Sequence, residues 1–177
     1  GSRCRLWFLE GCQDGWQDPL FQIKFSVINA NLLRRGMNLW PPFLGAGITV
    51  EKIAKDFRYA KVRLKHGLLN RNILGVHFGG SLFAMTDPFF MMMVSQNIGK
   101  AYIVWDQAAK IEFLKPGNGV VHASFELTQE QIDDIISAAE SGNKVLKDFV
   151  ADVKDREDDV VARITKTLYI RKKLKKS

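Results

Sequence analysis

The amino-acid sequence predicts an α+β fold in which a curved antiparallel sheet wraps around one long central helix. The segment from Asn70 to Gly99 begins with Asn and Gly residues and continues as an almost unbroken apolar run, which is typical of a helix buried on all sides. Most of the segments that follow alternate apolar and polar residues, the period of half-buried strands. Because few other helices are available to cover such a sheet, we expect the sheet to fold around the central helix.

Positive charge is concentrated at one end of the chain. The formal net charge of +7 on its own favours a nucleic-acid partner. Five of these charges lie at the C-terminal end and leave +2 for the remainder: Arg171, Lys172, Lys173, Lys175 and Lys176. A short basic tail is usually solvated. We therefore expect no nucleic-acid partner, and we keep a basic tail that binds nucleic acid or an anionic membrane as an alternative.

Length and composition favour a single globular domain. The chain has 177 residues, of which 46% are hydrophobic and 25% charged, as in ordinary globular proteins. Cys4 and Cys12 form neither a disulfide framework nor a zinc pattern, and no cofactor is expected. The apolar residues 6–9 are too few for an export signal, and Asp87-Pro88 interrupts the long apolar run, so no membrane span is expected. We predict a cytoplasmic protein.

The first quarter of the chain is expected to add a helix to the main domain. We divide the sequence into four parts: an N-terminal segment (1–19), a helix with a connector (20–46), the main domain (47–171) and a basic tail (172–177). Apolar residues three or four apart predict a helix over Leu20–Leu33, and Arg34-Arg35-Gly36 is typical of its C-terminus. Residues 40–47 are predicted as a connector whose aromatic side chains lie at the edge of the core.

The main domain is predicted to contain five strands and a short helix besides the central one. Ile48–Leu64 is expected as one extended segment with a bend or bulge near residues 54–56. Thr128 and Gln131 have the spacing of a capping box, which predicts a helix that ends near Gly142. Four more strands are predicted, with loops at 115–119 and 155–159: Ala101–Leu114, Val121–Leu127, Val145–Lys154 and Val160–Ile170. This order corresponds to the hotdog fold.

Three residues of the central segment have a characteristic spacing. Asn72 precedes Gly79 by seven residues, and Asp87 follows Gly79 by eight. This spacing resembles the catalytic segment of hotdog-fold acyl-CoA thioesterases related to the phenylacetyl-CoA thioesterase. Five signatures are similar to those of an uncharacterised bacterial branch of that superfamily, over residues 47–171: Asn70-Arg71-Asn72, Phe78-Gly79-Gly80-Ser81, Thr86-Asp87-Pro88, Phe113-Leu114-Lys115-Pro116-Gly117 and Tyr169-Ile170-Arg171-Lys172-Lys173.

The resemblance implies a catalytic role for these three residues. Thioester hydrolysis requires an activated water or a carboxylate nucleophile, together with donors for the oxyanion. Asp87 would act as base or nucleophile, a backbone N–H of Gly79 or Gly80 would polarise the carbonyl, and Asn72 would orient the water or the carbonyl. In one helix, eight residues span about 12 Å. The resemblance therefore implies a homodimer, with a tetramer as the larger alternative, in which the glycines of one subunit face the aspartate of the other.

Further residues are expected to contact the acyl thioester. We expect substrate contacts from residues of the central segment and of the 115–119 turn: Phe78, Gly80, Ser81, Asn70 and Lys115. Lys115 has the charge to bind coenzyme A phosphates. Met91-Met92-Met93 is typical of core filling, with an acyl tunnel as the alternative. The scattered histidines His66, His77 and His122 suggest no metal site.

Two positions depart from the thioesterase pattern. Phe78 stands where those enzymes have a histidine, with His77 one residue early, and Asp87 is followed by a proline. A non-catalytic acyl- or lipid-binding protein is therefore the alternative function. Asp87-Pro88 is also typical of a helix N-cap followed by proline at the first helical position. Asn70 and Asn72 have ordinary turn residues as their alternative interpretation.

Overall fold

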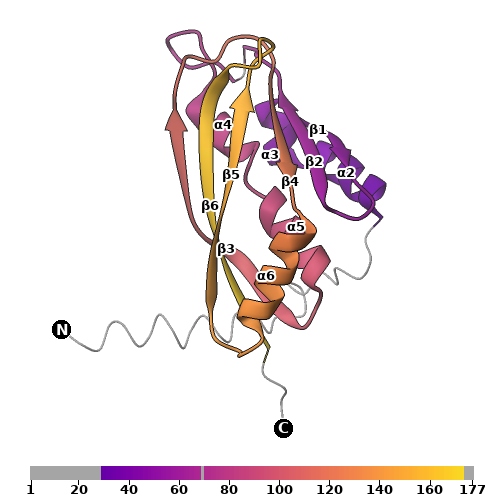
Figure 1. Ribbon diagram of the computed structural model, residues 1–177. Coiled ribbons are helices and arrows are strands. Elements are labelled where there is room, and N and C mark those ends of the chain that lie inside the picture. The colour runs from indigo at the N-terminus through magenta and orange to yellow at the C-terminus, as the bar shows by residue number, and fades with distance from the viewer. Residues whose placement is uncertain (1–28, 69, 174–177) are drawn as a thin grey trace, which may run out of the picture.

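The computed structural model describes residues 29–68 and 70–173, which form one six-stranded antiparallel sheet and five helices (Figure 1). The sheet order is β1-β2-β4-β5-β6-β3. The elements follow one another as α2 (Ala30–Leu39), α3 (Pro41–Ala46), β1 (Ile48–Ile53), β2 (Tyr59–Leu64), α4 (Gly79–Ala84), α5 (Phe89–Ile98), β3 (Tyr102–Phe113), β4 (Val121–Glu126), α6 (Gln129–Ala139), β5 (Val145–Lys154) and β6 (Val160–Lys172). The predicted N-terminal segment (1–19) and the first part of the helix predicted from Leu20 lie outside the described residues.

Neighbouring strands pair over most of their length everywhere in the sheet except between β4 and β5, in its middle. β6 pairs along most of its length with β3 on one side and with β5 on the other. β4 and β5 pair only through His122 with Lys154 and Ala123 with Val153, so the two strands diverge beyond that point. This divergence leaves an opening in the sheet that side chains of another element must fill, because protein interiors are closely packed.

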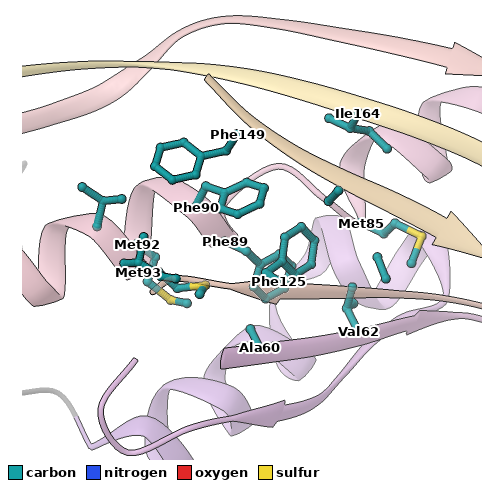
Figure 2. Packing of buried hydrophobic residues seen from close by; sticks show 14 of the residues in the cluster. Ala60, Val62, Met85, Phe89, Phe90, Met92, Met93, Phe125, Phe149 and Ile164 are labelled. Atoms are coloured by element: carbon teal, nitrogen blue, oxygen red, sulfur yellow. The ribbon is translucent and has the colours of Figure 1, made fainter. Parts of the chain in front are cut away.

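Aromatic side chains of α5 fill the space between the diverging strands. Phe89 stacks on Phe125 of β4 with ring centroids 4.6 Å apart. Phe90 contacts the edge of Phe125 at 5.2 Å and stacks on Phe149 of β5 at 4.9 Å. Figure 2 shows these rings between the strands, with Met92 and Met93 one helical turn further along. The predicted hotdog architecture, a curved sheet around a buried central helix, is therefore confirmed.

The predictions for the later elements are confirmed. The predicted strands correspond to β3, β4, β5 and β6. Thr128 and Gln131 form both hydrogen bonds of the capping box at the start of α6. Met92 and Met93 are buried, as expected for core filling.

Residues 48–64 correct the prediction of one bent strand. They form a hairpin, in which β1 and β2 are joined by a turn over 54–58. The Ala54 N–H donates to Tyr59 O at 2.8 Å, and Phe57 lies at a positive φ of 56°. The turn contains neither Gly nor Pro, so the alternation continues through it without an obvious stop signal.

The N-terminal helix also differs from the prediction. α2 continues through Gly36 to Leu39, and the expected connector contains the short helix α3, which begins with Pro41. The Asn38 side chain fixes α2 to the sheet, because it accepts from the Val50 N–H at 2.7 Å and donates to Val50 O at 3.1 Å. Phe43 is buried, whereas Trp40 is half exposed. This tertiary contact outweighs the weak helix propensity of a single glycine.

The long central helix is interrupted. α4 ends at Ala84 and α5 begins at Phe89, with a turn over residues 85–88. The residue before a proline resists helical conformation, which explains a break at Asp87-Pro88. The alternative that Asp87 caps α5 is wrong, because Pro88 is the N-cap and makes no side-chain capping bond.

Candidate active site

The turn between α4 and α5 presents Asp87 beside the sheet. Asp87 Oδ1 accepts a hydrogen bond from Lys166 Nζ of β6 at 2.6 Å. The Asp87 side chain is nevertheless 53% exposed. Because one oxygen is bound while the side chain remains accessible, the carboxylate is both anchored and available to a ligand.

A buried lysine and a second carboxylate lie behind Asp87. Lys166 is 1% exposed, and its ammonium lies 3.2 Å from Asp106 Oδ2 of β3 and 5.8 Å from the centroid of the Phe83 ring. Our sequence prediction missed both Lys166 and Asp106. A signal was present, since Lys166 occupies an inward position of β6 between Ile164 and Leu168, where the alternation otherwise places apolar residues. The structure thus adds two charged residues to the predicted site.

Burial determines the protonation behaviour of Asp106. Burial raises the pKa of the Asp106 carboxyl above its usual 3.8, and the nearby Asp87 raises that pKa further. The Lys166 ammonium acts in the opposite direction, through its charge and its hydrogen bond. Asp106 therefore accepts a proton more readily in the folded protein than in the unfolded chain.

This raised pKa makes stability depend on pH through Asp106. The folded state binds the Asp106 proton more tightly than the unfolded state, so this contribution to stability decreases as pH rises. We expect the free energy of unfolding of the wild type, minus that of Asp106→Asn, to decrease as pH rises above about 4, the usual pKa of an aspartate. Urea denaturation of both proteins at several pH values measures this difference. If the difference between the two free energies of unfolding stays constant or increases with pH, the pKa of Asp106 is not raised in the folded protein.

Two glycines begin α4. The N–H groups of Gly79 and Gly80 lie in the first helical turn, where the helix itself provides no acceptor. A Cβ added at Gly79 would lie 2.8 Å from Cζ of Phe113, and one at Gly80 would collide with the ring of Phe78. Both phenylalanines are more than half exposed. The two rings thus place apolar surface directly over the glycines, and Ser81 behind them is buried.

Asn70 and Asn72 organise the loop that leads to α4. Asn70 is buried, accepts from the Gly67 N–H at 2.8 Å and donates to Ala46 O at 2.9 Å and to Lys65 O. Asn72 Oδ1 accepts from the N–H groups of Leu74 at 2.9 Å and Val76 at 3.3 Å. The interpretation of both as turn residues is therefore confirmed. A role of Asn72 in orienting water stays a prediction.

His77 fixes the same loop to the loop between β3 and β4. Its Nε2–H donates to Gly119 O at 2.7 Å, and its backbone N–H donates to Gly117 O at 3.0 Å. Burial lowers the pKa of the His77 imidazole, which favours the neutral ring. These two hydrogen bonds hold His77 in place, and α4 begins two residues further along the chain.

Lys115 is engaged in ion pairs. Its ammonium lies 2.6 Å from Asp155 and 2.6 Å from Asp159, and the hydrogen bonds to these carboxylates raise the pKa of the Lys115 ammonium. These contacts tie the loop after β3 to the turn between β5 and β6. Phosphate binding by Lys115 stays a prediction.

Within one chain, Gly79 and Asp87 belong to two separate groups of residues, one at the start of α4 and one around the turn that follows it. The first, which we call the glycine group, contains Gly79, Gly80, Phe78 and Phe113. The second, the carboxylate group, contains Asp87, Lys166 and Asp106. In the part of the chain that the structure describes, no cluster of three metal-ligating residues occurs, and no helix is long and apolar enough to cross a membrane.

Residues 29–170 match the model of the family described as "Domain of unknown function (DUF4442)". The chain belongs to this family. No curated protein matches it. This places the protein in an uncharacterised branch, as the resemblance implied.

Solved structures share its fold. A Pseudomonas aeruginosa protein of unknown function, a probable thioesterase, is 18% identical with a TM-score of 0.74, over 82% of this chain and 97% of that one. A thioesterase from Haemophilus influenzae is 13% identical with a TM-score of 0.60, over 83% and 93% of the two chains. The PaaI protein of the E. coli phenylacetic acid degradation operon is 15% identical with a TM-score of 0.53, over 80% and 89%. Identities this low establish the hotdog fold alone.

Proposed function

We propose that this protein is an acyl-CoA thioesterase. The observation that carries the proposal is the Asp87 carboxylate, anchored at one oxygen by Lys166 and still half exposed. The spacing of Asn72, Gly79 and Asp87 supports it, since it resembles that of hotdog thioesterases. The thioesterase names of two proteins with the same fold are consistent with this reaction.

The proposed reaction uses water as the second substrate. Asp87 removes a proton from a water molecule as its oxygen attacks the thioester carbonyl, or attacks directly and forms an anhydride that water then hydrolyses. A backbone N–H of Gly79 or Gly80 donates to the developing oxyanion. The carbon–sulfur bond breaks when the oxyanion collapses, which gives the acid directly in the first route and the anhydride in the second. Both routes consume one water and yield a carboxylate, the free thiol of coenzyme A and one proton.

The two groups of site residues are proposed to meet across a homodimer. β3 is at one edge of the sheet, pairs only with β6 among the described strands, and runs for 12 residues (Figure 1). Residues 106–110 of this strand are exposed in succession on both faces. A long edge strand of this kind is a template for pairing with another chain. We propose that two β3 strands pair, and that the glycine group of each subunit faces the carboxylate group of the other.

Release of free thiol from short-chain, long-chain and aromatic acyl-CoAs tests the proposed activity. Saturable, protein-dependent release from at least one member of the panel is the expected result, and the preferred acyl group then defines the pocket. Saturable binding of acyl-CoA without thiol release would instead support the non-catalytic acyl-binding protein. That alternative rests on Phe78, which stands where the thioesterase pattern has a histidine.

A further inference from the structure

We infer that Lys166 is a positioning residue for Asp87, and that Asp106 holds Lys166 in place for this task. This inference rests on the proposed function, because it assigns a role around the same carboxylate. Lys166 belongs to β6, Asp106 to the edge strand β3, and Asp87 to the turn between α4 and α5. The three charges therefore connect the central helical segment to the edge of the sheet where we propose that the partner subunit pairs.

The burial of Lys166 requires a compensating interaction. Removing an ammonium from water is costly unless opposite charges and hydrogen bonds replace the lost solvation. Asp87 at 2.6 Å and Asp106 at 3.2 Å provide both. A hydrophobic residue at this inward position would fill the same space without these contacts, so packing alone does not explain a lysine here.

The geometry around Asp87 explains what the lysine does. The ammonium binds Oδ1, whereas Oδ2 makes no hydrogen bond to any residue that the structure describes. A hydrogen bond to one oxygen restricts the rotation of the carboxylate. Reacting groups that are held in one orientation react faster than groups that must be aligned in each encounter. Lys166 thus directs the unbound oxygen of Asp87 to one position.

Asp106 fixes the lysine from the other side. β3 has a register shift between Asp106 and Ala108 in its pairing with β6, which is a local irregularity at the residue whose side chain binds Lys166. Bulges of this type change the direction of a side chain. The Lys166 ammonium thus has two carboxylate partners, Asp87 at 2.6 Å and Asp106 at 3.2 Å.

Three variants separate positioning from structural support: Lys166→Met, Asp106→Asn and the double variant that combines them. Lys166→Met leaves the Asp106 carboxylate, whose side chain is 27% exposed, without its cation, so we expect a Tm lower by roughly 5 °C. Removing the Asp106 charge as well should restore most of this Tm. For hydrolysis of the best acyl-CoA, we expect kcat to decrease by about 100-fold in Lys166→Met with little change in KM, and to stay low in the double variant. Recovery of kcat together with Tm would overturn the inference, because it would show that the lysine acts only through stability.

Lys61→Met is the matched control. Lys61 lies on β2, towards the end of the sheet opposite β3, and pairs with Glu51 at 3.7 Å. We expect its kcat, KM and Tm to equal those of the wild type. A loss of kcat in this control as large as that in Lys166→Met would contradict a specific role of Lys166.

A measurement without substrate distinguishes failure of this inference from failure of the proposed function. The carboxyl ¹³C resonance of Asp87, assigned by its absence in Asp87→Asn, should shift in Lys166→Met and not in Lys61→Met. An unshifted resonance would overturn the contact and hence the inference, whatever the activity. Absence of thiol release by the wild type across the acyl-CoA panel would overturn the proposed function. The contact between Lys166 and Asp87 would then have no role in catalysis.

Discussion

Asp87→Asn is expected to lower kcat for thioester hydrolysis by about 1,000-fold, since general bases typically contribute between about 100-fold and about 10,000-fold. The amide cannot accept the proton of water or act as a nucleophile. It keeps the shape of the side chain and retains one oxygen that can accept from Lys166. We therefore expect the fold to persist, and thiol release measured beside circular dichroism and size-exclusion chromatography tests both expectations.

Asp152→Asn is the control for Asp87→Asn. Asp152 also forms a close ion pair, with Arg163 at 2.7 Å, but it lies on β5 away from the α4–α5 turn. Its replacement removes one exposed charge pair, which contributes little to stability. We expect wild-type kcat in this variant. A folded Asp87→Asn protein with wild-type kcat would remove Asp87 from the mechanism.

The confirmed elements are those whose signals are local in the sequence. Thr128 and Gln131 are three residues apart, and both capping bonds form as their spacing predicts. Alternation along β4 correctly identified its buried face, which consists of Val121, Ala123 and Phe125. The strand prediction depends only on the alternation of side chains between the two faces of a strand. The helix prediction depends only on side chains that bind the backbone of their own helix terminus.

The missed features depend on conformation or on distant residues. The turn after β1 is formed around Phe57 at φ 56°, a conformation for which an aromatic residue is no signal. Lys166 and Asp87 are 79 residues apart, so their contact depends on the complete fold. The sequence does indicate an unusual lysine on the inward face of β6, but only the structure identifies its partners. The sequence analysis leaves a helix cap as the alternative role of Asp87, whereas the structure pairs Asp87 with Lys166.

Two inactive variants are expected to restore activity to one another when they form mixed dimers. If the glycines of one subunit act with Asp87 of the other, then Asp87→Asn and Gly79→Pro each inactivate both sites of their own homodimer. A mixed dimer contains one doubly defective site and one intact site. With random association, half of the dimers are mixed, so we expect about a quarter of wild-type activity. The measurement is thiol release by the unfractionated, co-expressed chains compared with each variant alone, and mixed dimers purified through two different tags should reach about half of wild-type activity.

Gly79→Pro is designed to remove a donor while keeping the helix. Gly79 is the first residue of α4, a position at which proline is tolerated because its missing N–H has no helical acceptor. Phe78 before it already has the extended conformation that proline requires, with φ −66° and ψ 125°. The exposed Phe113 ring must move to admit the new side chain. A Gly79→Pro homodimer that remains fully active would show that another donor, such as the N–H of Gly80, stabilises the oxyanion.

The controls for complementation are dimers that contain no intact site, purified through two different tags. Two differently tagged Asp87→Asn chains should form dimers and remain inactive, which excludes a contribution from the tags. A chain that carries both Asp87→Asn and Gly79→Pro, mixed with wild type, should leave each mixed dimer with one defect at both of its sites, so these mixed dimers should be inactive. If the glycines and the aspartate of the same subunit instead formed a site, the same mixture would retain one intact site in every mixed dimer. The two arrangements therefore give opposite results from the same pair of chains, and the comparison determines whether catalysis crosses the subunit interface.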